Sequence, residues 1–176
     1  MTPMRRLVAP LIACAALLAP VPAHAATAHA TSAPAVRAPS AVAKPIKLVK
    51  VGTLRIPRLR LTQPIYKGIT MYVFDRGMGQ WPGTAAPGKV GNMVIGGHRT
   101  GGSMPLYYID KLKRGDKIFV TAKGKTHKYK VTGARIVSPK AVWITKQSRA
   151  KTLTLFACHP LHSIAKRWIV SAVLVP

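Results

Sequence analysis

Short β-type segments, separated by glycine and proline, are the feature of this sequence that most limits the folds open to it. Beyond Val51, β-branched residues and alternation with a period of two recur in short runs. The strand candidates are residues 93–95, 118–120, 129–131, 152–158 and 167–175. The turn at residues 123–125 predicts a hairpin between two of them, and one or two short helical turns are expected, near residues 106–112. The pattern predicts one all-β domain, a barrel or a sandwich, over residues 51–176.

The first 25 residues predict a secretory signal peptide. Arg5 and Arg6 precede an apolar stretch, and Ala23-His24-Ala25 has the small-x-small pattern of a cleavage site. Two alternatives stay open: the segment could remain uncleaved as a membrane anchor, or Cys14 could carry a lipid, because the residues before it resemble a bacterial lipobox. In each case we expect an exported protein, at the extracellular face of the membrane or in the cell wall.

Residues 26–50 have a composition unlike that of the rest of the chain. They are rich in alanine, proline, serine and threonine and have no aromatic side chains. Such a segment cannot bury enough apolar surface to offset its ordering entropy, so it predicts a disordered linker between signal and domain.

The charge of the chain indicates which partners it attracts. Lysine and arginine number 28 against three acidic residues, which gives a formal net charge of +25. Nucleic acid, anionic lipid and anionic wall polymer would all be attracted to such a surface. Because export separates the protein from nucleic acid, the expected partner is the anionic cell envelope. The alternative is that the charge only keeps the surface soluble.

Cys158 is the one cysteine left if the signal peptide is removed. The mature chain then cannot form an internal disulfide. An unpaired thiol in an exported protein is exposed to oxidation, so it usually serves a purpose. A buried, inert cysteine is the alternative.

The last two strand candidates place a cation beside this thiol. Alternation along residues 152–158 puts Ala157 and Cys158 on opposite faces, with the cysteine at the strand end. Pro160 stops the strand, and the chain returns from Arg167. If the two strands pair antiparallel, Arg167 lies beside Cys158, where a cation favours the thiolate and can donate hydrogen bonds to an oxyanion. A surface arginine at a strand end is the alternative.

His98 is the best candidate among six histidines for a proton-transferring partner of the thiol. It follows an apolar strand and Gly96-Gly97. Glycine permits unusual backbone angles and close approach, so a strand end can present a side chain to a site. His159 is the rival because it adjoins Cys158, but neighbours in a strand point to opposite faces.

Three dispersed motifs contain these candidates: residues 154–158 (Thr-Leu-Phe-Ala-Cys), residues 97–100 (Gly-His-Arg-Thr), and Arg167. In this order they resemble the sortases, a family of cysteine transpeptidases, and the histidine segment is most similar to that of class E sortases of high-GC Gram-positive bacteria. The resemblance covers residues 52–175. Further matching segments are Trp81-Pro82-Gly83-Thr84, Pro87-Gly88, Gly91-Asn92, Val142-Trp143 and Cys158-His159-Pro160.

The resemblance implies a sortase β-barrel of about eight strands with short helical turns. It implies that Cys158 attacks the Thr carbonyl of a C-terminal sorting signal, Leu-Ala-x-Thr-Gly or Leu-Pro-x-Thr-Gly, on a secreted protein. His98 would exchange protons with the leaving and incoming amines, and Arg167 would hold the substrate backbone and the oxyanion. The acceptor would be an amine of a peptidoglycan precursor or a pilin lysine. No cofactor is expected, because the sequence has no metal-ligand cluster and its three scattered acids argue against the calcium site of some sortases.

One residue departs from the family pattern, and two other functions stay open. Ala157 stands where sortases usually have threonine, which puts the rate and the substrate preference in question. An L,D-transpeptidase also uses cysteine, histidine and arginine, but its Ser-x-Gly-Cys-x-Arg cluster is not matched by residues 156–160. A non-enzymatic, cationic wall-binding module with an inert thiol is the second alternative.

Overall fold

The computed structural model describes residues 47–176. The predicted signal peptide and residues 26–46 of the predicted linker lie outside the described residues. Within residues 47–176, no helix is both long and apolar enough to cross a membrane. The elements in chain order are β1 (Lys50–Ile56), η1 (Pro57–Leu59), β2 (Leu61–Lys67), α1 (Met71–Phe74), β3 (Met78–Gln80), β4 (Gly91–Gly96), η2 (Ile109–Lys111), β5 (Lys117–Ala122), β6 (Lys125–Val137), η3 (Val142–Thr145), β7 (Lys151–His159) and β8 (Lys166–Val175).

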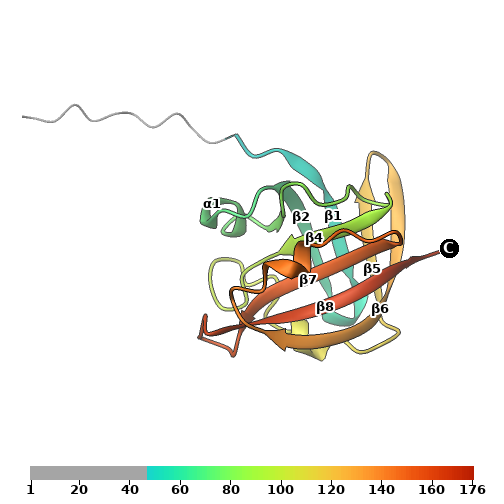
Figure 1. Ribbon diagram of the computed structural model, residues 1–176. Helices are drawn as coiled ribbons and strands as arrows, with labels where there is room; N and C mark the ends of the chain where they lie inside the picture. The colour runs from blue at the N-terminus through green and yellow to red at the C-terminus, as the bar shows by residue number, and fades with distance from the viewer. Residues whose placement is uncertain (1–46) are drawn as a thin grey trace, which may run out of the picture. The chain divides into compact units, whose positions relative to one another are not determined.

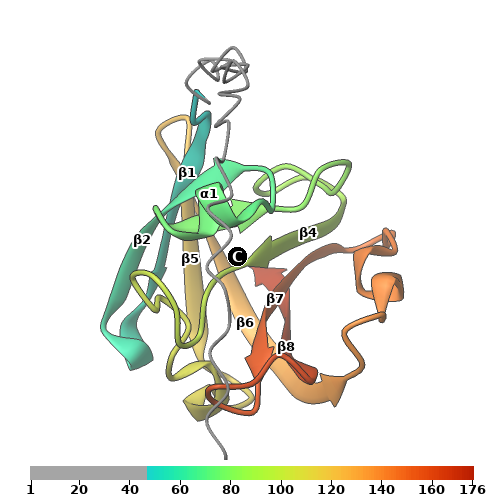
Figure 2. The ribbon, with the colours of Figure 1, turned by 90° about the vertical axis from the view of Figure 1, so that its left-hand side faces the viewer.

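Eight strands close into one barrel in the order β1-β2-β3-β4-β7-β8-β6-β5. Figures 1 and 2 show the barrel from two sides. Neighbouring strands are antiparallel except in the pairs β2–β3 and β4–β7, which are parallel. Closure removes the free sheet edges that an open sheet would leave. The prediction of an all-β barrel with short helical turns is confirmed, and the sandwich alternative is wrong.

The predicted hairpin is β5–β6. Ala122 and Lys125 pair across its two-residue turn. Lys123 and Gly124 in the turn have φ of 49° and 75°, and positive φ at both positions is typical of the tight turn that joins twisted antiparallel strands. The helix η2 supplies the helical turn expected near residues 106–112.

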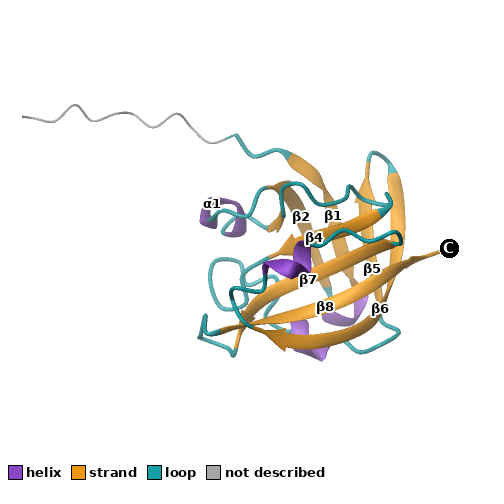
Figure 3. Ribbon diagram, viewed as in Figure 1, coloured by secondary structure: helices purple, strands orange, loops and turns teal. Residues whose placement is uncertain are grey.

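Alternating side chains of β7 line both sides of the barrel wall. Leu153, Leu155 and Ala157 point inward and are buried in the barrel core, as their alternation predicts. Phe156 points outward and packs with Ile144 in a second apolar cluster, which η3 helps to cover (Figure 3). The middle of β7 is therefore buried on both faces, and the strand is more accessible at its two ends.

Candidate active site

Cys158 and Arg167 lie directly opposite one another in the antiparallel β7–β8 pair. Directly paired residues point to the same face of a sheet, so the thiol and the guanidinium share the outer face of the barrel. Cys158 is a free, half-buried thiol. The antiparallel pairing predicted from the sequence is therefore present, with the expected register.

A cavity of about 650 Å³ opens at the end of β7, and the three predicted site residues line it together. His98 enters from the loop after β4, Cys158 from β7 and Arg167 from β8. The other lining side chains include apolar Met71, Phe74, Phe156 and Ile164 and the polar His162 and Ser163. The cavity thus combines a thiol, an imidazole and a guanidinium with an apolar wall, which is the composition of a site that binds and transforms a ligand.

The glycines before His98 act through close approach. Gly96 pairs with Phe156 in the β4–β7 ladder, and a Cβ atom added to Gly96 would lie 2.3 Å from the Phe156 ring. Neither Gly96 nor Gly97 has a positive φ. Of the two expected reasons for glycine here, unusual backbone angles and close approach, the structure supports the second.

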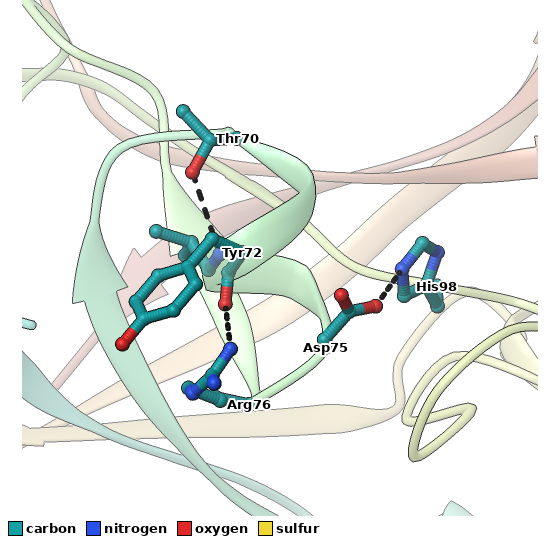
Figure 4. A network of polar contacts seen from close by, with 6 residues as sticks. Thr70, Tyr72, Asp75, Arg76 and His98 are labelled. Atoms are coloured by element: carbon teal, nitrogen blue, oxygen red, sulfur yellow. Dashed lines mark hydrogen bonds and ion pairs between the residues drawn. The ribbon is translucent and has the colours of Figure 1, made fainter. Parts of the chain in front are cut away.

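Asp75 holds the imidazole of His98. Its Oδ1 atom lies 3.0 Å from Nε2 of His98, and Figure 4 shows the two side chains pointing toward one another from the end of α1 and from the loop after β4. The ring of Phe74 adds an edge contact, with centroids 5.7 Å apart. An ionised carboxylate only accepts hydrogen bonds, so Nε2 carries a proton and Nδ1 is the nitrogen left for chemistry in the cavity.

The short helix α1 keeps Asp75 in place. Thr70 caps it by accepting a hydrogen bond from the Val73 N–H (Figure 4). The Asp75 N–H closes it by donating to the Met71 carbonyl oxygen. Asp75 is a site residue that was not predicted from the sequence. The signal was present, because Asp75 is one of only three acidic residues in the chain, but its separation of 23 positions from His98 gives no hint of contact.

Arg167 is anchored at one nitrogen. Its Nη1 donates to the carbonyl oxygens of Ile164 and Lys166, at 2.8 and 2.9 Å. Among the described residues, Nε and Nη2 have no such partner, so two parallel donors remain for a ligand in the cavity.

His159, the rival histidine, is engaged away from the thiol. Its Nδ1 lies 2.9 Å from Nη1 of Arg99, and its ring stacks at a tilt on Trp168 with centroids 5.2 Å apart. The opposite orientation of Cys158 and His159 expected from strand alternation is thus observed.

Ala157, the departure from the family pattern, faces the barrel core with only 2% of its surface exposed. A threonine there would direct its side chain inward too. The missing hydroxyl is therefore a difference in the core beneath the thiol.

The three acidic side chains each contact a histidine or an arginine. Within residues 47–176, no three histidine, cysteine or acidic side chains gather as a metal site would require. Asp75 contacts His98, Asp110 pairs with Arg99, and Asp116 pairs with Arg58.

Comparison with protein families identifies the chain. The sortase domain model matches residues 54–175. The chain belongs to the sortase family. This sortase is 36% identical to sortase SrtE1 of Streptomyces coelicolor over an alignment of 138 residues. The alignment covers 69% of this chain and 39% of SrtE1. It is 29% identical to sortase A of Bacillus anthracis, over 71% of the chain and 60% of that protein. The chain therefore spans about two fifths to three fifths of these relatives.

Solved sortase structures share the barrel. A lid mutant of sortase A from Corynebacterium diphtheriae superposes with a TM-score of 0.70 at 27% identity, covering 74% of this sortase and 73% of that chain. The sortase D5 transpeptidase of Clostridium perfringens gives a TM-score of 0.68 at 29% identity, with 75% and 83% covered. The resemblance stated from the motifs is thereby confirmed, and so is the sortase-type fold.

Proposed function

We propose that this sortase is a cysteine transpeptidase with Cys158 as nucleophile, His98 as general acid and base, and Arg167 as the group that holds the substrate and the oxyanion. The observation that carries the proposal is the register pairing of Cys158 with Arg167 at the mouth of the cavity that His98 also lines. Its substrate is a secreted protein with a C-terminal Leu-Ala-x-Thr-Gly or Leu-Pro-x-Thr-Gly signal, cleaved between threonine and glycine.

Acylation begins with transfer of the Cys158 thiol proton to Nδ1 of His98. The resulting thiolate attacks the threonine carbonyl carbon, which forms the S–C bond and moves charge onto the carbonyl oxygen. The two free donors of Arg167 face that charge. The C–N bond then breaks, and the departing glycine amine takes a proton from Nδ1 of His98, leaving a thioester on Cys158.

Transfer to the acceptor reverses these roles. The acceptor amine attacks the thioester carbonyl, Nδ1 of His98 takes a proton from that amine, and the C–S bond breaks to regenerate the thiolate. The product is an amide, so the bond cleaved in the first half is replaced by one of the same kind.

Acceptor and location are part of the same proposal. The acceptor is an amine of a peptidoglycan precursor or of a pilin, at the outer face of the membrane or in the wall. Among the similar structures, sortase C1 of group B Streptococcus is described with a pilus island, which supports a pilin lysine as one option. Cell fractionation tests the location, since recovery of the full-length chain from the cytoplasm would contradict it.

The decisive experiment is mass spectrometry of the protein incubated with a panel of sorting-motif peptides and an amine. We expect a thioester on Cys158, release of the glycine-containing fragment and an amide product with the amine. Cys158→Ala keeps the fold and should show none of these. Cleavage by Cys158→Ala near the wild-type rate would show that Cys158 is not the nucleophile. An unreactive Cys158 in the wild type, with no peptide cleaved, would favour the wall-binding alternative.

A further inference from the structure

The residues that directly follow His98, Cys158 and Arg167 form a cluster of their own. These are Arg99, His159 and Trp168, and they meet at the inner side of the site. Nη1 of Arg99 lies 2.9 Å from Nδ1 of His159. The Trp168 ring packs against His159 and lies 5.9 Å below the Arg99 guanidinium carbon. Each member of the inner cluster is one peptide bond from a residue of the proposed active site.

Arg99 is the centre of the inner cluster. It is a charged residue with only 2% of its surface exposed. Nε donates to the Tyr107 carbonyl oxygen at 3.2 Å, and Nη2 pairs with Oδ1 of Asp110 at 3.0 Å. A buried cation is tolerated only when paired and hydrogen-bonded, and here all three guanidinium nitrogens have partners.

The contact with His159 fixes the tautomer of that histidine. A guanidinium has donors and no acceptor, so Nδ1 of His159 must accept and cannot carry a proton. The ring proton of neutral His159 therefore lies on Nε2. This assignment can be measured and does not depend on any catalytic activity.

The Arg99–His159 bond lies beyond the end of the pairing between β4 and β7. The parallel ladder between β4 and β7 runs to Gly96 opposite Phe156, followed by one hydrogen bond from Gly97 N–H to the Phe156 carbonyl oxygen at 3.3 Å. Arg99 and His159 each lie three residues beyond the last pair. Their side-chain bond thus joins the loop after β4 to the end of β7, one residue beyond His98 and Cys158.

We propose that Arg99 is a positioning residue, which sets the separation of His98 and Cys158 by binding the acceptor nitrogen of His159. The inference rests on the proposed function, because it concerns the geometry of that reaction. The separation of His98 and Cys158 affects the rate because proton transfer requires a fixed geometry. A displacement of about 1 Å between reacting groups can cost roughly 100-fold in rate.

Two substitutions at His159 separate positioning from packing. His159→Asn keeps an acceptor atom close to the place of Nδ1, whereas His159→Leu keeps bulk and removes the acceptor. We expect kcat for acylation by a sorting peptide to stay within about 3-fold of wild type for the Asn variant and to fall about 10- to 100-fold for the Leu variant. KM should change little, because binding of the peptide requires no proton transfer by His98.

Arg99→Lys and a spectroscopic measurement complete the test. The lysine keeps the charge but lacks the planar fork, so it should lower kcat as His159→Leu does. The ¹⁵N shifts of His159 should report the Nε2–H tautomer in wild type and lose that signature in Arg99→Lys. Melting curves confirm that each variant is folded.

Three results would overturn the inference, and they can be told apart. Equal loss of kcat in His159→Asn and His159→Leu would show that ring packing matters and the acceptor does not. An Nδ1–H tautomer in the wild type would exclude the Arg99 bond. A wild-type protein that acylates no sorting peptide would instead remove the proposed function, and the positioning role with it.

Discussion

Arg167 offers the sharpest test at the scale of single residues. Lysine in its place keeps the positive charge but loses the two parallel donors that remain free in the structure. We expect Arg167→Lys to lower the acylation rate by a factor of about 10² to 10³, the effect of removing an oxyanion donor. Alkylation of Cys158 by iodoacetamide needs a thiolate and no oxyanion, so it should fall far less. Measuring both rates side by side checks this, and equal losses would assign Arg167 to thiolate formation.

Asp75 is the second residue whose role a conservative pair of variants can define. Asp75→Ala removes the partner of His98 Nε2, whereas Asp75→Asn keeps an oxygen that can accept the same hydrogen bond. We expect kcat for peptide cleavage to fall about 10-fold in the Ala variant, because a misoriented His98 loses part of its rate contribution as a general acid. The fall should be smaller in the Asn variant. Single-turnover kinetics distinguishes the two, and an Ala variant as active as wild type would show that Phe74 and the cavity suffice to orient His98.

At the scale of elements, the contact between β4 and β7 depends on Gly96. A Cβ atom there would lie 2.3 Å from the Phe156 ring, so Gly96→Ala must displace that ring or separate the strands. Overpacking of this kind costs about 1–3 kcal/mol of unfolding free energy. Gly133→Ala in β6 is a matched control, because nothing lies within 4 Å of its added Cβ atom. Urea unfolding of both variants measures the difference, and equal stability would mean that Phe156 moves freely.

Tyr129 links β6 to the loop before β4 through its bond with Gly88. It also makes the unfolding free energy decrease at alkaline pH. Burial raises the pKa of its phenol above the ordinary value near 10, and the hydrogen bond from the Gly88 N–H offsets this only in part. Because the unfolded chain ionises at a lower pH than the folded one, this contribution to stability is complete below about pH 10 and declines as pH rises through the folded pKa.

The Tyr129→Phe variant isolates that contribution. It removes the acceptor for Gly88 and should cost about 1 kcal/mol at neutral pH. Above about pH 10 the wild type should lose stability faster than the variant, so the two unfolding free energies converge. Lysine titration affects both proteins equally, and urea unfolding across the alkaline range gives the difference. Parallel curves would show that Tyr129 does not titrate on unfolding.

At the scale of the whole molecule, the positive charge has almost no internal compensation. The chain has 28 basic residues, and its three carboxylates are each engaged with His98, Arg99 or Arg58. We expect retention on an anionic wall polymer that weakens steeply as salt shortens the screening length from about 10 Å at 0.1 M. Acylation by an uncharged peptide should be nearly insensitive to salt. Co-sedimentation and kinetics over one salt series test this, and salt-resistant retention would point to specific contacts instead of net charge.

Much of the site could be predicted from sequence because its signals are local. Strand alternation places Cys158 and Ala157 on opposite faces, and the short return from Pro160 to Arg167 makes antiparallel pairing the simplest connection. His98 was recognisable from the glycines before it and from its motif. The reason for those glycines was only partly evident, because the ring that fills the space beside Gly96 belongs to a residue 60 positions away.

The sequence by itself determined the fold class, the hairpin register that pairs Cys158 with Arg167, and the three candidate residues. These depend on side-chain period and on neighbours close in the chain. Only the tertiary structure decided that Asp75 holds His98 and that Arg99 binds His159. Both contacts join segments that meet because the barrel closes and β4 pairs in parallel with β7. Such pairing is fixed by packing across the whole core, and no local pattern of residues records it.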